Sequence, residues 1–124
     1  MTVELHTLSN GLRIVTEHMP GLESAALGVW VSAGCRHEAP EQNGVAHFLE
    51  HMAFKGTTRR SALQIAEEIE DVGGYINAYT SREVTAYYAR VLKDDVALAL
   101  DLISDIVLNP IFDPREIEVE RGVI

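Results

Sequence analysis

Two histidines and a glutamate near the middle of the chain have the types and spacing of a metal-dependent hydrolytic site. They stand in the run His47-Phe48-Leu49-Glu50-His51. Histidines at positions i and i+4 lie on one side of an α-helix, one turn apart, so both imidazoles can reach the same metal ion without bending the backbone. Glu50 is poorly placed to displace either histidine. Its carboxylate is therefore free to take a proton from a water molecule that a zinc ion has made more acidic.

The order of these residues, H-x-x-E-H, is the reverse of the H-E-x-x-H zinc motif found on helices of metalloproteases. Histidine and glutamate are also common on the polar face of amphipathic helices, so the pattern can arise by chance. The five residues alone leave two hypotheses open, a zinc site or an interaction domain without a metal. Metal analysis of the protein separates them.

The elements that must position this motif are predicted from periodicity and from the residues that end helices and strands. Asn10-Gly11 indicates a hairpin between two early strands, and Ser61 with Gln64 forms a capping box at the start of a helix. Strands are expected over residues 3–7, 12–18, 24–34, 75–80 and 84–92, and helices over residues 45–55, 62–72, 94–109 and 114–124. Strands come first and then alternate irregularly with helices, which favours an α+β fold with an antiparallel sheet packed with helices.

The predicted elements also have assigned faces and caps. In the helix over residues 94–109, apolar residues at helical spacing predict a buried stripe of Val96, Ala99, Leu100, Ile103 and Val107. In the strand over residues 24–34, Leu27, Val29 and Val31 share one face and Trp30 lies on the other. Asp113 is the expected N-cap of the last helix, followed by Pro114 at its first position.

Composition narrows the class of protein. The 124 residues carry 10 Lys and Arg against 19 Asp and Glu, a formal net charge of −9. This size suits one domain, and the acidic surface disfavours a nucleic-acid partner. The single cysteine, Cys35, excludes an intrachain disulfide framework. The longest apolar run is too short to span a membrane and the N-terminus does not resemble a targeting segment, so a cytoplasmic protein is expected.

Four ordered blocks identify a family. The segment from Ala46 to Thr57 resembles the active-site helix of the pitrilysin, insulin-degrading enzyme and mitochondrial processing peptidase family. The resemblance extends to residues 8–13, 73–83 and 120–123, and so covers essentially the whole chain. The best match is the branch of bacterial processing peptidases that are similar to the mitochondrial β subunit.

The resemblance implies a role for each matching residue. His47 and His51 would bind Zn²⁺, and Glu50 would be the general base. Phe54 would line the pocket that follows the scissile bond, and residues 77–79 (Asn77, Ala78 and Tyr79) would form an edge strand that pairs with an extended peptide. For Phe54 and Tyr79, plain core packing remains an alternative.

A catalytic zinc ion normally has three protein ligands, and the resemblance puts the third seven residues after Glu120, beyond Ile124. Glu120 itself would be a supporting carboxylate for the site. Residues 1–124 are therefore expected to be the N-terminal portion of a catalytic domain that is incomplete at its C-terminal end. Such a chain is expected to bind zinc weakly, to be inactive alone and to self-associate. Glu116, Glu118 or Glu120 as a substitute ligand is left open.

These observations predict a zinc-dependent metalloendopeptidase that hydrolyses extended peptides or presequence-like segments. A second half of the same chain or a partner subunit would complete the enzyme. The alternative is a non-catalytic core or partner subunit of the same fold. Such subunits typically lose motif residues, and the intact His47, Glu50 and His51 argue against it.

Overall fold

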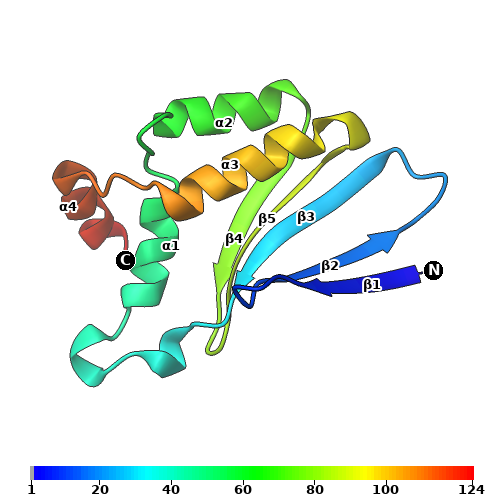
Figure 1. The fold of residues 1–124 in the computed structure, drawn as a ribbon. Coiled ribbons are helices and arrows are strands. Elements are labelled where there is room, and N and C mark those ends of the chain that lie inside the picture. Colours follow the sequence, from blue (N-terminus) through cyan, green and yellow to red (C-terminus); the bar gives the residue numbers. More distant parts are fainter. Residues whose placement is uncertain (1) are drawn as a thin grey trace.

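An antiparallel three-stranded sheet forms the centre of the fold. The structure is a computed structural model that describes residues 2–124. The strands, in order across the sheet, are β3 (Ser24–Val31), β5 (Thr85–Leu92) and β4 (Tyr75–Thr80). A separate antiparallel hairpin of β1 (Thr2–Thr7) and β2 (Arg13–His18) extends beside β3 (Figure 1).

Helices cover one face of this sheet. Figure 1 shows α2 (Ala62–Asp71) and α3 (Val96–Leu108) lying over the sheet, with α1 (Val45–Ala53) standing beside β4 at the end of the layer. The last helix, α4 (Pro114–Val123), packs against α1. The predicted α+β fold with an antiparallel sheet is confirmed.

The core lies between β5 and the helices. Strand β5 pairs on both sides, and its side chains at alternate positions Tyr87, Ala89 and Val91 face α3. A central strand buried on one face by helices needs this alternation, because successive side chains point to opposite faces. The buried cluster consists of Ala53, Ile65, Ile69, Tyr87, Ala89, Val91, Ala99, Leu102, Ile103 and Ile106.

The buried stripe of α3 differs from the prediction. Leu102 and Ile106 are fully buried, whereas Leu100 is 51% exposed and Val96 lies near the surface. Asp101, Ser104 and Asp105 share one face of this helix, so periodicity marks that face as polar and moves the predicted stripe away from it. Asp105 is also buried, although an aspartate is normally assigned to the surface when only the sequence is known.

Two predicted boundaries also shift. The strand expected over residues 24–34 ends at Val31, and Val31 is itself 39% exposed. The helix expected from residue 94 begins at Val96, after a short 3₁₀ turn over residues 93–95. The loop before α1 contains two further 3₁₀ turns, over residues 35–37 and 40–42, which periodicity cannot reveal because each is shorter than one repeat.

The predicted caps are confirmed by hydrogen bonds. Ser61 Oγ accepts from the Gln64 amide at 3.1 Å, and Gln64 Oε1 accepts from the Ser61 amide at 2.8 Å. Asp113 Oδ1 accepts from the Arg115 amide at 2.8 Å, at the start of α4. These hydrogen bonds satisfy amides that have no partner within the helix, which fixes where each helix begins.

A buried carboxylate ties the loop after α1 to α3. Asp105, 1% exposed, accepts hydrogen bonds from Thr57 Oγ1 at 2.6 Å, from Arg60 Nη1 at 2.9 Å and from Asn109 Nδ2 at 3.1 Å. Burial alone would raise the pKa of Asp105, but these hydrogen bonds outweigh it and lower the pKa to about 2. The loop that leaves the H-x-x-E-H helix is therefore held by an ionised group inside the protein.

The β1–β2 hairpin is exposed along its whole length. It carries apolar side chains on its surface, among them Val3, Leu5, Ile14 and Val15. Within residues 2–124, none of the helices is long and apolar enough to cross a membrane.

Candidate active site

Helix α1 is fixed at its start by the preceding loop. Gly44 adopts a φ of 96°, a left-handed conformation that other residues rarely take, and the helix begins at the next residue. The Glu38 carboxylate accepts a hydrogen bond from the Val45 amide at 2.7 Å. A carboxylate at a helix N-terminus satisfies a free amide and interacts favourably with the helix dipole. The motif is thus presented on a helix whose first turn is held in place.

The two motif histidines converge on one point. Their Nε2 atoms lie 3.0 Å apart, and their rings meet edge to face with centroids 4.6 Å apart. Two nitrogen ligands of a tetrahedral zinc ion, each about 2.0–2.1 Å from the metal, lie about 3.3 Å from each other. The arrangement of His47 and His51 therefore fits a pair of ligands to one zinc ion.

A carboxylate from α4 orients the second histidine. Glu120 Oε2 lies 2.9 Å from Nδ1 of His51, and Glu120 Oε1 accepts a hydrogen bond from Lys55 Nζ at 2.8 Å. A carboxylate that accepts from Nδ1–H leaves the lone pair of Nε2 available to a metal. The hydrogen bond from Lys55, opposed by burial and reinforced by His51, lowers the pKa of Glu120 below its ordinary value. Glu120 therefore contacts one of the two candidate metal ligands.

Within residues 2–124, no group of three or more histidine, cysteine, aspartate or glutamate side chains is arranged to hold a metal ion. Glu120 contacts the Nδ1 side of His51, away from the paired Nε2 atoms, and so does not complete the ligand set. Glu118 pairs with Arg121, and Glu116 lies 3.8 Å from Lys55. None of the three proposed substitute ligands joins the two Nε2 atoms in a group that could hold a metal ion.

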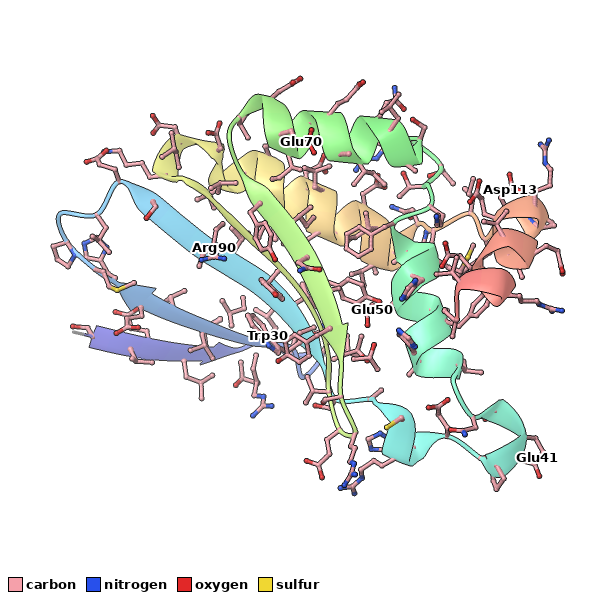
Figure 2. The ribbon with its side chains drawn as sticks, turned by 180° about the vertical axis from the view of Figure 1, so that it is seen from behind. Trp30, Glu41, Glu50, Glu70, Arg90 and Asp113 are labelled. Carbon is pink, nitrogen blue, oxygen red and sulfur yellow. The ribbon has the colours of Figure 1, made fainter. Side chains whose placement is uncertain are left out.

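Glu50 points from α1 towards the sheet (Figure 2). Its Oε2 atom accepts a hydrogen bond of 2.6 Å from the hydroxyl of Thr80, the last residue of β4. Burial, together with the negative charge of Glu50, raises the pKa of the Tyr87 phenol, which keeps that hydroxyl protonated beside the site. The candidate base therefore lies on the same helix as the candidate metal ligands and accepts a hydrogen bond from the sheet.

The predicted peptide-binding strand lies at an edge of the sheet. Among the described residues, β4 pairs only with β5. Asn77 and Tyr79 are exposed, with Ala78 half-buried between them, so core packing does not explain Tyr79. Asn77 Nδ2 donates to the Tyr75 hydroxyl at 2.6 Å, and Asn77 Oδ1 accepts from the Ala78 amide at 2.8 Å.

A groove of about 370 Å³ runs between β4 and α2. It is lined by Phe54, Ile65, Ile69, Gly74 and Ile76 among others. Phe54 is half-buried, packs against the core and lies 6.4 Å from the Tyr87 ring, measured between centroids. Phe54 therefore both packs against the core and lines the groove.

Three residues that contact the site had no predicted role. These are Thr80 on Glu50, Lys55 on Glu120 and Glu38 at the start of α1. Lys55 lies one turn after His51, a local signal that could have been used. Thr80 and Glu50 are 30 residues apart, and no spacing rule connects them.

Comparisons with known proteins decide the family. The sequence profile of the family described as "Insulinase (Peptidase family M16)" matches residues 13–124. This chain belongs to the insulinase family of peptidases. The predicted resemblance is thereby confirmed. Relatives of this insulinase-family chain are named as zinc proteases and processing peptidases. These names support a family of metallopeptidases.

Individual relatives are similar over almost all of this M16 chain. An uncharacterized zinc protease of Bacillus subtilis is 48% identical over 98% of the chain and 30% of its own length. A probable mitochondrial-processing peptidase subunit beta of Arabidopsis thaliana is 55% identical over 95% of the chain and 22% of its own length. The crystal structure of a protease from Helicobacter pylori matches with a TM-score of 0.91 at 28% identity, over 98% of this chain and 30% of that one. The chain thus spans less than a third of the length of these relatives.

Proposed function

We propose that residues 1–124 form the first part of a zinc-dependent metalloendopeptidase that cleaves extended peptides or presequence-like segments. The observation that carries the proposal is the convergence of the His47 and His51 Nε2 atoms at 3.0 Å on the helix that also carries Glu50. His47 and His51 would hold the zinc ion together with a third ligand supplied outside these residues. Glu120 would orient His51.

The metal and the protein side chains would make separate contributions to the reaction. Zinc, when bound, supplies a Lewis acid that makes water more acidic and polarises the carbonyl of the scissile bond. Glu50 takes one proton from the attacking water as the oxygen bonds to the carbonyl carbon. It then returns that proton to the leaving amide nitrogen as the carbon–nitrogen bond breaks.

The edge strand supplies the peptide-binding surface in this proposal. An extended peptide that adds to β4 gains main-chain hydrogen bonds, and alternate side chains enter the groove beside Phe54. The groove lining is mainly apolar, which suits an apolar side chain. The net charge of −9 would attract basic segments to the molecule as a whole.

A second candidate function is a non-catalytic subunit of the same fold. It is favoured only by the relatives named as subunits, and the complete H-x-x-E-H motif opposes it. In either case we propose that a second half or a partner subunit completes the protein. We also propose a cytoplasmic, bacterial setting.

The ligand count leads to a prediction about the 124-residue chain. We expect it to bind zinc more weakly than the full-length protein, to show no chelator-sensitive peptide cleavage and to form oligomers in solution. Two histidines hold zinc less firmly than three ligands, and the apolar residues on the β1–β2 hairpin favour association. Zinc titration, cleavage of a fluorogenic peptide with and without a chelator, and light scattering test this. Robust chelator-sensitive cleavage by the short chain would disprove it, as would a full-length protein that lacks zinc.

Glu120 gives a further prediction. In the full-length protein, Glu120→Ala should weaken zinc binding by about 10- to 100-fold, because His51 loses the carboxylate that holds its ring and its tautomer. Competition with a zinc-binding dye measures the affinity. Glu67→Ala, at an exposed position on α2, is the matched control and should bind zinc like the wild type. Equal affinities in the two variants would remove the supporting role.

A further inference from the structure

We propose that Thr80 is a positioning residue that sets the orientation of the Glu50 carboxylate for proton transfer. This inference rests on the proposed function and adds to it a residue outside the zinc motif. It is carried by the 2.6 Å hydrogen bond from Thr80 Oγ1 to Glu50 Oε2, which joins β4 to α1.

The length of this bond is typical of a hydroxyl that donates to an ionised carboxylate, for which oxygen–oxygen distances are about 2.5–2.7 Å. A threonine hydroxyl has a single proton, so its donation to Oε2 leaves the other oxygen of Glu50 without this partner. The last torsion of a glutamate side chain is broad and is poorly defined without a partner. Thr80 therefore selects one orientation of the carboxylate and leaves Oε1 for the water.

The donor is itself held rigidly. Thr80 ends β4, and the turn after it is closed by hydrogen bonds between Ser81 and Val84, including Ser81 N to Val84 O at 2.8 Å. Thr80 pairs with Thr85 of β5, so the strand pairing extends to the last residue of β4. The position of the Thr80 hydroxyl is thus determined by the sheet and not by α1, so it serves as a fixed reference for a side chain on the helix.

The pair Thr80 and Thr85 provides a matched experiment. Both are threonines at one level of the same sheet, but the Thr80 hydroxyl donates to Glu50, whereas the hydroxyl of the buried Thr85 donates to the Ala33 carbonyl at 2.8 Å. In the full-length protein, Thr80→Val keeps the shape and removes the hydroxyl, Thr80→Ser restores a hydroxyl, and Thr85→Val removes one elsewhere. Zinc content, kcat and KM for an extended peptide are measured at a temperature at which every variant remains folded.

We expect Thr80→Val to lower kcat by about 10- to 100-fold, the effect of losing one hydrogen bond to a charged group. KM and zinc content should stay within about twofold of the wild type, because the β4 backbone and the histidines are unchanged. Thr80→Ser should recover most of the rate, and Thr85→Val should keep the wild-type kcat. In a Glu50→Gln background, adding Thr80→Val should cause no further loss, because Thr80 acts through Glu50.

Three results would overturn the inference. They are a wild-type kcat in Thr80→Val, a Thr80→Ser variant as slow as Thr80→Val, and an equal loss in Thr85→Val. Glu50→Gln separates this inference from the proposed function. If Glu50→Gln abolishes cleavage while Thr80→Val does not lower kcat, only the role of Thr80 is wrong. If Glu50→Gln cleaves normally, the proposed function itself fails.

Discussion

Replacing Glu50 with glutamine in the full-length protein should reduce peptide cleavage by at least about 10²- to 10⁴-fold, the usual contribution of a general base. Glutamine keeps the size of the side chain and can still accept the hydrogen bond from Thr80, but it cannot take a proton from water. The histidine pair is untouched, so the zinc content should equal that of the wild type.

The result is measured as kcat for a fluorogenic extended peptide together with the zinc content of each preparation. Glu67→Gln is the matched control, since Glu67 is exposed on α2, and it should cleave at the wild-type rate. Normal cleavage by Glu50→Gln would refute the proposed mechanism. No cleavage by the wild type would instead favour the non-catalytic subunit.

The second large effect concerns stability. Replacing Asp105 with alanine should destabilise the fold by about 3–5 kcal/mol, because it leaves Arg60 and Thr57 without their buried partner. The Arg60 side chain is only 10% exposed, and Glu68 and Asp101 remain as its other partners. Urea unfolding followed by circular dichroism gives the change in the free energy of unfolding.

Asp101→Ala is the matched control for Asp105→Ala. Asp101 lies one turn earlier on α3 and contacts Arg59 and Arg60, but its side chain is 45% exposed. An exposed ion pair contributes about 0–1 kcal/mol, so the loss should be several times smaller. Equal losses in the two variants would show that burial of Asp105 is not what makes the network strong.

The same carboxylate determines part of the acid sensitivity. The pKa of Asp105 is held at about 2 in the folded protein, against an ordinary value of 3.8. A carboxyl group whose pKa is lowered by folding stabilises the protein above its ordinary pKa, and this contribution is lost as the pH falls through the folded pKa. We therefore expect wild-type stability to decline by about 2 kcal/mol from this group between about pH 5 and pH 2. Asp105→Asn should lack this part of the decline. The same dependence of unfolding free energy on acidic pH in Asp105→Asn and the wild type would contradict the assignment.

The sequence by itself determined the elements that depend on local spacing. The H-x-x-E-H run places two histidines and a glutamate on one helix, because residues three and four apart share a face. The Ser61–Gln64 capping box and the Asp113 cap were predicted correctly, because each joins groups within three residues. The family was also predicted correctly from the sequence, since its motifs are short blocks of neighbouring residues in a fixed order.

Only the tertiary structure decided which distant residues complete the site. Thr80 is 30 residues from Glu50, Glu120 is 69 from His51, and Thr57 is 48 from Asp105. Of these pairs, the resemblance pointed only to a supporting role for Glu120, and no local period connects any of them. The prediction of the buried stripe of α3 was partly wrong for a related reason, because Asp101, Ser104 and Asp105 share a face that the sequence marks as polar, although Asp105 is buried. The orientation came from packing on the sheet and from the hydrogen-bonded burial of Asp105, which are properties of the folded chain.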